Sequence, residues 1–338
     1  MAHINIPIFV PHLGCPHTCV FCNQKRITGQ TGFSIESFHE TVRAHLATAD
    51  ENAEKELAFF GGSFTAIDRD LMITLLTYAK AYLDNGSVSS IRLSTRPDAI
   101  DEEILSILKI YGVSTIELGI QSTDNTVLQL SERGHTAKDS ENACKLIADH
   151  GFSLVGQMML GLPASSLDAE LKTANDMIKW GVQAVRIYPT VVFSDTALAD
   201  LTREGHYLPL TVSEAAERCG VLLETFDLAN IPVIRIGLCE TDGLRKDNTL
   251  CGAYHPALGE MCHTAFFRRK IEAALSQCHI PDGATVTVEV SPSSLSQAIG
   301  HKKSNLTYFE KRHPACHFLF KPSFALGKKE VKILTKEN

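Results

Sequence analysis

Short apolar strands alternate with amphipathic helices from residue 4 to residue 236, and this alternation most constrains the fold. Six expected strands are Ile4–Val10, Leu57–Phe60, Ser90–Ser94, Thr115–Gly119, Ser153–Leu160 and Val182–Tyr188. Strands that are joined by helices run parallel and are covered by those helices. Because six units are too few to close an eight-stranded barrel, we expect an α/β fold with a partial (βα)6 parallel barrel.

The helices between these strands have recognisable starts. Ser34, Asp68 and Asp101 are expected to cap three of them, and Thr211 with Glu214 forms a capping box for a helix that ends near Ala229. The loops that follow the carboxyl ends of parallel strands meet at one rim, where the active sites of such folds lie. The loops of this chain are therefore expected to build one site.

The remainder of the chain divides into two parts. Residues 237–280 are less regular and are interpreted as a linker with a substrate loop, in which Tyr254 and His255 are candidate substrate-facing groups. Residues 281–338 predict a small basic α/β domain, with a strand, a helix, the loop Gly300-His301-Lys302-Lys303, a second helix and a second strand. The predicted boundaries are thus 1–236, 237–280 and 281–338.

The net charge of −7 is unevenly distributed along the 338 residues. From His279 onward nine Lys and Arg oppose five Asp and Glu, a net of +4, so the rest of the chain carries −11. A basic end on an acidic body favours a polyanionic partner for that end. No apolar run approaches the roughly 20 residues of a membrane span, and the start lacks a secretory pattern. We expect a cytoplasmic protein without a membrane partner.

Three clustered cysteines follow the first expected strand. Cys15, Cys19 and Cys22 are separated by three and then two residues. Three thiolates on one loop can ligate three irons of a cubic cluster and leave the fourth iron open to a ligand. A structural zinc site is the alternative, with His12 or His17 as the fourth ligand.

The other seven cysteines are scattered, as is typical of small buried side chains in a reducing compartment. For one group of these cysteines the alternative is that they bind a second cluster or a zinc ion. That group is Cys239, Cys251 and Cys262 with His255 and His263, whose spacings are wide and irregular.

The cysteine spacing, with aromatic Phe21 before the last cysteine, resembles the radical SAM superfamily. Five further blocks, in order, resemble the branch that contains the Elongator catalytic subunit and the coproporphyrinogen-dehydrogenase-like enzymes. The likeness covers about residues 4–210 and is closest to the Elongator subunit. The blocks are Phe59-Phe60-Gly61-Gly62-Ser63-Phe64, Ser94-Thr95-Arg96-Pro97-Asp98, Ile116-Glu117-Leu118-Gly119-Ile120-Gln121-Ser122, Arg133-Gly134-His135-Thr136 and Gly161-Leu162-Pro163.

The resemblance implies a [4Fe-4S] cluster on the three cysteines and S-adenosylmethionine (SAM) on its open iron. One electron would then split SAM and give a 5′-deoxyadenosyl radical. It also implies the cofactor contacts. Phe21 would lie beside the adenine, the Gly61-Gly62-Ser63 turn would bring backbone to the methionyl ammonium, and Arg133 would pair with the carboxylate. Polar contacts to the ribose or amino acid are expected from Glu117, Gln121 and, more weakly, Gln157.

The C-terminal order of strand, helix, Gly-rich loop, helix and strand resembles a KH-type RNA-binding unit. Lys302 and Lys303 would contact phosphates, although position 303 is lysine where the KH loop has its second glycine. The alternative is a small α/β appendage with a solvated basic face.

The favoured function is a radical SAM enzyme that modifies RNA, most readily a tRNA nucleoside. It would have a flavodoxin- or ferredoxin-type reductant protein and no DNA partner. Because the chain ends at Asn338 without an acetyl-CoA-type glycine loop, we expect the radical step without acetyl transfer. The alternatives are an enzyme acting on a small molecule such as a tetrapyrrole, and a non-catalytic metal- and RNA-binding protein.

Overall fold

The computed structural model describes residues 3–10, 15, 19–23, 33–238 and 249–336. Within them, seven strands form one parallel sheet in the order β1-β2-β3-β4-β5-β6-β8. This sheet confirms the predicted partial parallel barrel, to which β8 adds a seventh strand. The strands are β1 His3–Phe9, β2 Glu54–Phe60, β3 Ser90–Thr95, β4 Val113–Gln121, β5 Ser153–Leu160, β6 Ala184–Pro189 and β8 Val233–Ile236.

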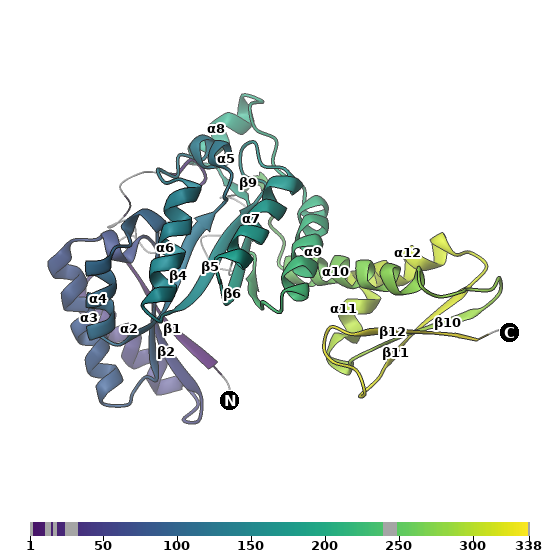
Figure 1. The fold of residues 1–338 in the computed structure, drawn as a ribbon, viewed down its shortest axis with the longest axis horizontal. Helices are drawn as coiled ribbons and strands as arrows, with labels where there is room; N and C mark the ends of the chain where they lie inside the picture. Colours follow the sequence, from purple (N-terminus) through teal and green to yellow (C-terminus); the bar gives the residue numbers. More distant parts are fainter. Residues whose placement is uncertain (1–2, 11–14, 16–18, 24–32, 239–248, 337–338) are drawn as a thin grey trace. The chain divides into compact units, whose positions relative to one another are not determined.

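Helices join successive strands, as the alternation predicts, and cover one side of the sheet (Figure 1). Ser34, Asp68 and Asp101 each accept a backbone hydrogen bond at a helix start, so the predicted caps are confirmed. The helices are α2 Ile35–Thr48, α3 Arg69–Asp84, α4 Glu102–Ile110, α5 Asn125–Leu130, α6 Ala137–Asp149 and α7 Leu167–Lys179.

The core lies between this sheet and its helices. Alternate residues of β4, Ile116 and Leu118, are fully buried, and Phe59 of β2 stacks on Phe38 of α2 with ring centroids 6.2 Å apart. Burying such side chains contributes about 1.5–3 kcal/mol each. The apolar face thus fixes the register of each strand and, with it, the position of the residues at its carboxyl end.

The first two strands end side by side at the rim. The Val10 amide donates to Phe60 O at 2.7 Å, and Gly61 then turns with φ +97°. A Cβ at Gly61 would lie 3.3 Å from Val10 N, so both the turn and the close approach favour glycine. The end of β1 at Val10 and the Gly61 turn are therefore held next to each other.

The chain forms two compact units, residues 1–209 with 230–252 and residues 210–229 with 253–338. This division differs from the predicted boundaries at 236 and 280. The segment expected to be a linker contains α10, Leu258–Leu275, an 18-residue helix. Neighbouring positions of α10 such as Thr264, Ala265 and Phe266 are all buried, so the sequence shows no single apolar face that would predict a surface helix.

The first unit also contains a small antiparallel pair, β7 Val191–Phe193 with β9 Thr249–Gly252, and the helix α8 Ala197–Arg203. In the second unit, β10 Thr285–Val290 lies between β11 His317–Pro322, which is parallel to it, and β12 Val331–Lys336, which is antiparallel. Its helices are α9 Val212–Leu228, α10, α11 Leu295–Ile299 and α12 Ser304–Arg312. The predicted order of strand, helix, loop, helix and strand is present, and β12 is an addition.

No helix in the described part of the chain is both long and apolar enough to cross a membrane.

Candidate functional site

The cysteine segment is fixed to the first unit through its backbone. Val20 N donates to Ser131 O at 3.3 Å, and Leu198 N donates to Val20 O at 2.8 Å. The side chain of Val20 packs in a buried cluster with Val192 and Leu198, and Phe21 lies against the same cluster. Cys19 is buried as a result, while Cys15 and Cys22 are partly exposed.

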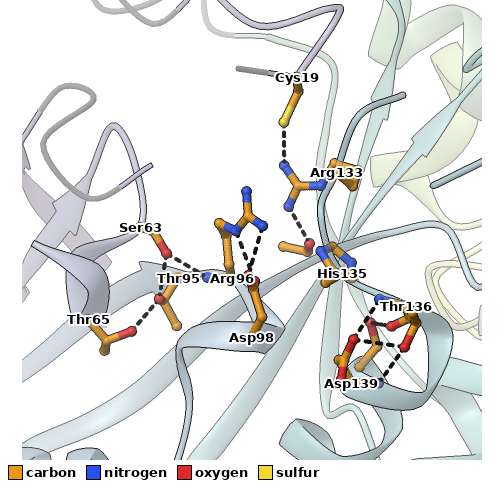
Figure 2. Close-up of polar contacts among 12 residues, drawn as sticks. Cys19, Ser63, Thr65, Thr95, Arg96, Asp98, Arg133, His135, Thr136 and Asp139 are labelled. Atoms are coloured by element: carbon orange, nitrogen blue, oxygen red, sulfur yellow. Dashed lines mark hydrogen bonds and ion pairs between the residues drawn. The ribbon is translucent and has the colours of Figure 1, made fainter. Parts of the chain in front are cut away.

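Arg133 places a permanent positive charge against Cys19. Its Nη1 donates to Cys19 Sγ at 3.2 Å and its Nη2 donates to Gly119 O at 2.9 Å (Figure 2). A Cβ at Gly119 would lie 3.3 Å from Arg133 Nη2 and 3.0 Å from Gln121 Nε2, so the missing side chain admits both groups. Residue 119 of the Ile116–Ser122 block is therefore a glycine at a position where the Arg133 guanidinium lies close to where a side chain would begin.

Arg96 is a second buried guanidinium near the cysteines, and the sequence-based reasoning assigned it no role. Its Nε and Nη2 donate to the two carboxylate oxygens of Asp98, each at 2.9 Å (Figure 2). Burial alone would lower the pKa of Arg96, but Asp98, with smaller contributions from Cys19 and Cys15, raises it. Burial alone would raise the pKa of Asp98, but the hydrogen bonds and the charge of Arg96 lower it. The pair therefore stays charged.

Hydroxyl groups tie the Gly61-Gly62 loop to Arg96. Ser63 Oγ lies 3.0 Å from Thr95 Oγ1 and accepts the backbone N–H of Arg96 at 3.1 Å. Thr65 Oγ1 lies 2.5 Å from Thr95 Oγ1 and donates to Ala99 O at 2.6 Å. Ser63, predicted as a cofactor contact, thus positions the backbone after β3.

Glu117 lies in a network of buried charges on strands β3 to β6. Its carboxylate is 2.9 Å from Arg186 Nε and 3.6 Å from Arg92 Nη1, and it accepts a hydrogen bond from Gln157. Arg92 also pairs with Glu56 at 2.7 Å. The predicted contacts Glu117 and Gln157 are therefore together, and the Glu117 carboxylate already has cationic partners within the chain.

Gln121 ends β4 in a left-handed conformation, with φ +64°. Such a backbone costs a glutamine about 1–3 kcal/mol and is found where the surroundings enforce it. Its Oε1 is buried and has no hydrogen-bond partner within the described residues. Gln121 thus offers an acceptor next to Arg133.

His135 lies below Arg133 in the same region. Its Nε2 is 3.3 Å from Ile120 O, and burial, with the nearby charge of Arg133, lowers its pKa to about 4. The imidazole is therefore neutral at pH 7, and its Nδ1 is buried without a partner in the described part of the chain.

The remaining predicted residues lie in the second unit. His255 Nδ1 accepts the Ala257 N–H at 3.0 Å, and its ring centroid is 6.0 Å from that of His301. Tyr254 is partly exposed. Lys302 and Lys303 are exposed and have φ of +53° and +60°.

Among the described residues, the ligands predicted for the two metal centres do not come together as a complete metal site. No group of three or more His, Cys, Asp or Glu side chains in residues 3–10, 15, 19–23, 33–238 and 249–336 is placed to hold a metal ion. Cys262 is buried and Cys251 partly so, whereas Cys239, like His12 and His17, lies outside the described residues.

The donors beside Cys19 fit an anionic group. Arg133 Nε and Arg96 Nη1 are buried and have no hydrogen-bond partner in the described ranges. Leaving such a donor unpaired costs about 1–3 kcal/mol or more when it is charged. The thiolates of a bound cluster and the carboxylate of SAM are acceptors of the kind that these two unpartnered donors fit.

Cys19 and the two buried arginines Arg133 and Arg96 thus mark a candidate active site at the carboxyl rim of a parallel partial barrel. A family model described as "Radical SAM superfamily" matches residues 9–177, half of the chain. A second, described as "Radical_SAM C-terminal domain", matches residues 182–266. The chain belongs to the radical SAM superfamily and is an enzyme of that class.

Similar proteins lie in the Elongator branch. The tRNA uridine(34) acetyltransferase of Methanocaldococcus jannaschii is 28% identical, over 60% of this chain and 45% of that protein. Elongator complex protein 3 of Homo sapiens is 31% identical, over 38% of this chain and 24% of its own length. The chain therefore spans less than half of either relative.

The fold is similar to that of archaeal Elp3 from Methanocaldococcus infernus, solved with an N-terminal deletion. The TM-score is 0.63 and the identity 19%, over 80% of this chain and 64% of that one. At this identity the likeness concerns the fold alone.

Proposed function

We propose that this chain holds a [4Fe-4S] cluster on Cys15, Cys19 and Cys22, cleaves SAM there, and thereby modifies a tRNA nucleoside. The observation that carries the proposal is the Arg133 guanidinium on Cys19 Sγ, at 3.2 Å. Held by these cysteines, the cluster would pass one electron from a reductant protein to SAM, and the cleavage to methionine would supply a 5′-deoxyadenosyl radical for hydrogen abstraction from the substrate.

The residues of the rim orient the cofactor in this proposal. Gly61 and Gly62 bring backbone to the methionyl ammonium, and Phe21 lies beside the adenine. Gln121 offers its unpartnered Oε1 to a hydroxyl or ammonium group. Arg133 and Arg96 neutralise the thiolates and the carboxylate, and a charge-assisted hydrogen bond of this kind contributes about 1.5–3 kcal/mol.

Glu117 and Gln157 act more deeply in the sheet. With Arg92 and Arg186 on its carboxylate, Glu117 is fixed in position, and Gln157 donates to the same carboxylate. Two cationic partners and an amide donor hold the side chain of this buried residue in one position. We propose that this network fixes β4 and thereby positions Gln121, the last residue of β4, for its contacts with the ribose.

The tRNA substrate is supported by the names of the similar proteins and by the charge of the chain. Residues from His279 onward carry a net +4. Each lysine that neutralises a phosphate releases counterions and makes binding depend on salt. The reductant in this proposal is a flavodoxin- or ferredoxin-type protein.

The proposal is tested by anaerobic reconstitution with iron and sulfide, followed by a dithionite-driven assay for 5′-deoxyadenosine with and without total tRNA. Cys19→Ala should abolish product formation. Cys278→Ala removes an exposed cysteine outside the site and is the matched control, which should keep the activity.

Two results would count against the proposal. SAM cleavage that proceeds equally in Cys19→Ala would remove the cluster from the account. SAM cleavage that tRNA never stimulates, while a small metabolite does, would remove the RNA substrate and leave the radical chemistry.

A further inference from the structure

The three-stranded sheet of the second unit has two different faces. Val286, Val288 and Val290 of β10 alternate toward the helices and are fully buried. On the same face Phe318 of β11 stacks on Phe309 of α12, with ring centroids 5.6 Å apart. Figure 1 shows α10 to α12 on one side of these strands. This face is the core of the unit.

The other face is open to solvent, and the strand register gives its composition. Lys321 and Lys332 lie on either side of Glu289, and Leu319 and Leu334 lie on either side of Thr287. Cross-strand partners share a face, so these residues form two rows across the sheet. Leu334 is 43% exposed, and both lysines are exposed.

A third row, His317, Thr285 and Lys336, continues the same face. We call these three rows the open face. It carries three lysines against one glutamate, with an apolar middle row between two polar ones. A flat, basic surface with an apolar centre is complementary to a chain of phosphates and bases.

Phe324 lies in the loop between β11 and β12, three residues after Lys321 of the open face, and is 93% exposed. The loop is held in place on both sides of it. Ser323 N donates to Val290 O at 2.8 Å, and Lys270 Nζ donates to Lys329 O at 2.8 Å. The anchored loop thus presents the phenylalanine ring to a partner, and covering the ring would remove apolar surface from water.

From these observations we infer that the open face, with Phe324, binds single-stranded RNA. The lysines contact phosphates and the phenylalanine ring stacks on an unpaired base. A duplex hides the faces of its bases, whereas tRNA loops present them. The inference rests on the proposed tRNA substrate and names the surface that would bind it.

The open face competes with the predicted KH-like loop as the RNA surface. Lys302 and Lys303 lie between α11 and α12, on the helical side of the unit, and no exposed aromatic residue lies next to them in sequence. Phe324 favours the open face because base stacking adds to binding that charge alone leaves weak and sequence-independent.

The test measures binding of fluorescently labelled total tRNA to the full-length, reconstituted protein by anisotropy across a salt series. One variant combines Lys321→Gln, Lys332→Gln and Lys336→Gln, and a second is Phe324→Ala. The matched control combines Lys302→Gln and Lys303→Gln. All six positions are exposed, so the fold should be unaffected, which circular dichroism checks.

The open-face lysine variant should weaken binding and reduce the salt slope by about 2, at roughly 0.7 per phosphate contact with single strands. Phe324→Ala should weaken binding about fivefold to a hundredfold with the salt slope unchanged, and Phe324→Tyr should restore it. The control should bind within about twofold of wild type, because its lysines lie off the open face.

Two outcomes would overturn the inference and are distinguishable. If wild type binds tRNA but only the control variant loses binding, the open face is not the RNA surface, although the proposed substrate stands. If wild type shows no salt-dependent tRNA binding, the proposed substrate fails together with the surface.

Discussion

Protonation of His135 should destabilise the first unit as the pH falls. The side chain is 5% exposed, and burial with the charge of Arg133 lowers its pKa from 6.5 to about 4. The unfolded chain therefore binds a proton near pH 6.5, where the folded chain does not. The stabilising contribution is fully present above pH 6.5 and is lost as the pH falls from there to about 4.

The size of the effect follows from the shift. A difference of about 2.5 pKa units corresponds to about 3 kcal/mol, which is lost completely only below about pH 4. Between about pH 7.5 and about pH 5.5 the loss is about 1.3 kcal/mol, because at the lower pH the unfolded imidazole is largely protonated and the folded one is not.

Urea unfolding of the reduced protein at the two pH values measures this loss. Trp180 is the single tryptophan and lies in the first unit, so its fluorescence reports the unit that contains His135. His135→Gln keeps an amide nitrogen that can donate to Ile120 O but does not titrate. The pH-dependent loss should be smaller in this variant than in wild type by about 1.3 kcal/mol.

His206→Gln is the matched control, since His206 is an exposed histidine of the same unit. It should keep the wild-type pH dependence. Equal losses in wild type and His135→Gln would refute the reasoning, because they would mean that His135 binds its proton equally well in the folded and unfolded chain.

Four further substitutions test the site and the core of the second unit. Gly119→Ala should displace the Arg133 guanidinium, whose Nη2 would lie 3.3 Å from the new Cβ, and lower the urea-derived stability by about 1–3 kcal/mol. Arg96→Gln should weaken SAM binding to the reconstituted protein, measured by equilibrium dialysis, by about tenfold to a hundredfold, and Asp98→Asn by less. Phe309→Ala removes a ring stacked on Phe318 and should lower the free energy of unfolding of the second unit by about 3–5 kcal/mol. Far-ultraviolet circular dichroism during urea unfolding measures this loss.

The strands and helix starts could be predicted because the local signals are strong. Buried parallel strands show short apolar runs such as Leu57–Phe60, and caps such as Asp101 precede their helices directly. The helix α10 could not be predicted, since its buried residues surround much of its circumference. The strand β12 is polar on one face and partly exposed on the other, so no apolar run marks it.

The roles of single residues in the site are likewise only partly predictable from the sequence. Taken alone, the Gly61-Gly62 pair indicates an ordinary turn and Arg133, between α5 and α6, a surface cation. They are predicted in the site only because their motif blocks, in order behind the cysteines, resemble the radical SAM superfamily. The role of Arg96 depends on Asp98, which orients its guanidinium, and on Ser63 from the loop after β2, which holds its backbone. Such a role comes from contacts between segments that the sequence does not place together.

Electron paramagnetic resonance of the reconstituted, chemically reduced protein, recorded before and after addition of SAM, tests the central claim most directly. The account predicts the signal of a reduced [4Fe-4S] cluster that changes when SAM is added, is lost in Cys19→Ala and persists in Cys278→Ala. A signal that SAM leaves unchanged in wild type, or one that survives in Cys19→Ala, would contradict the account.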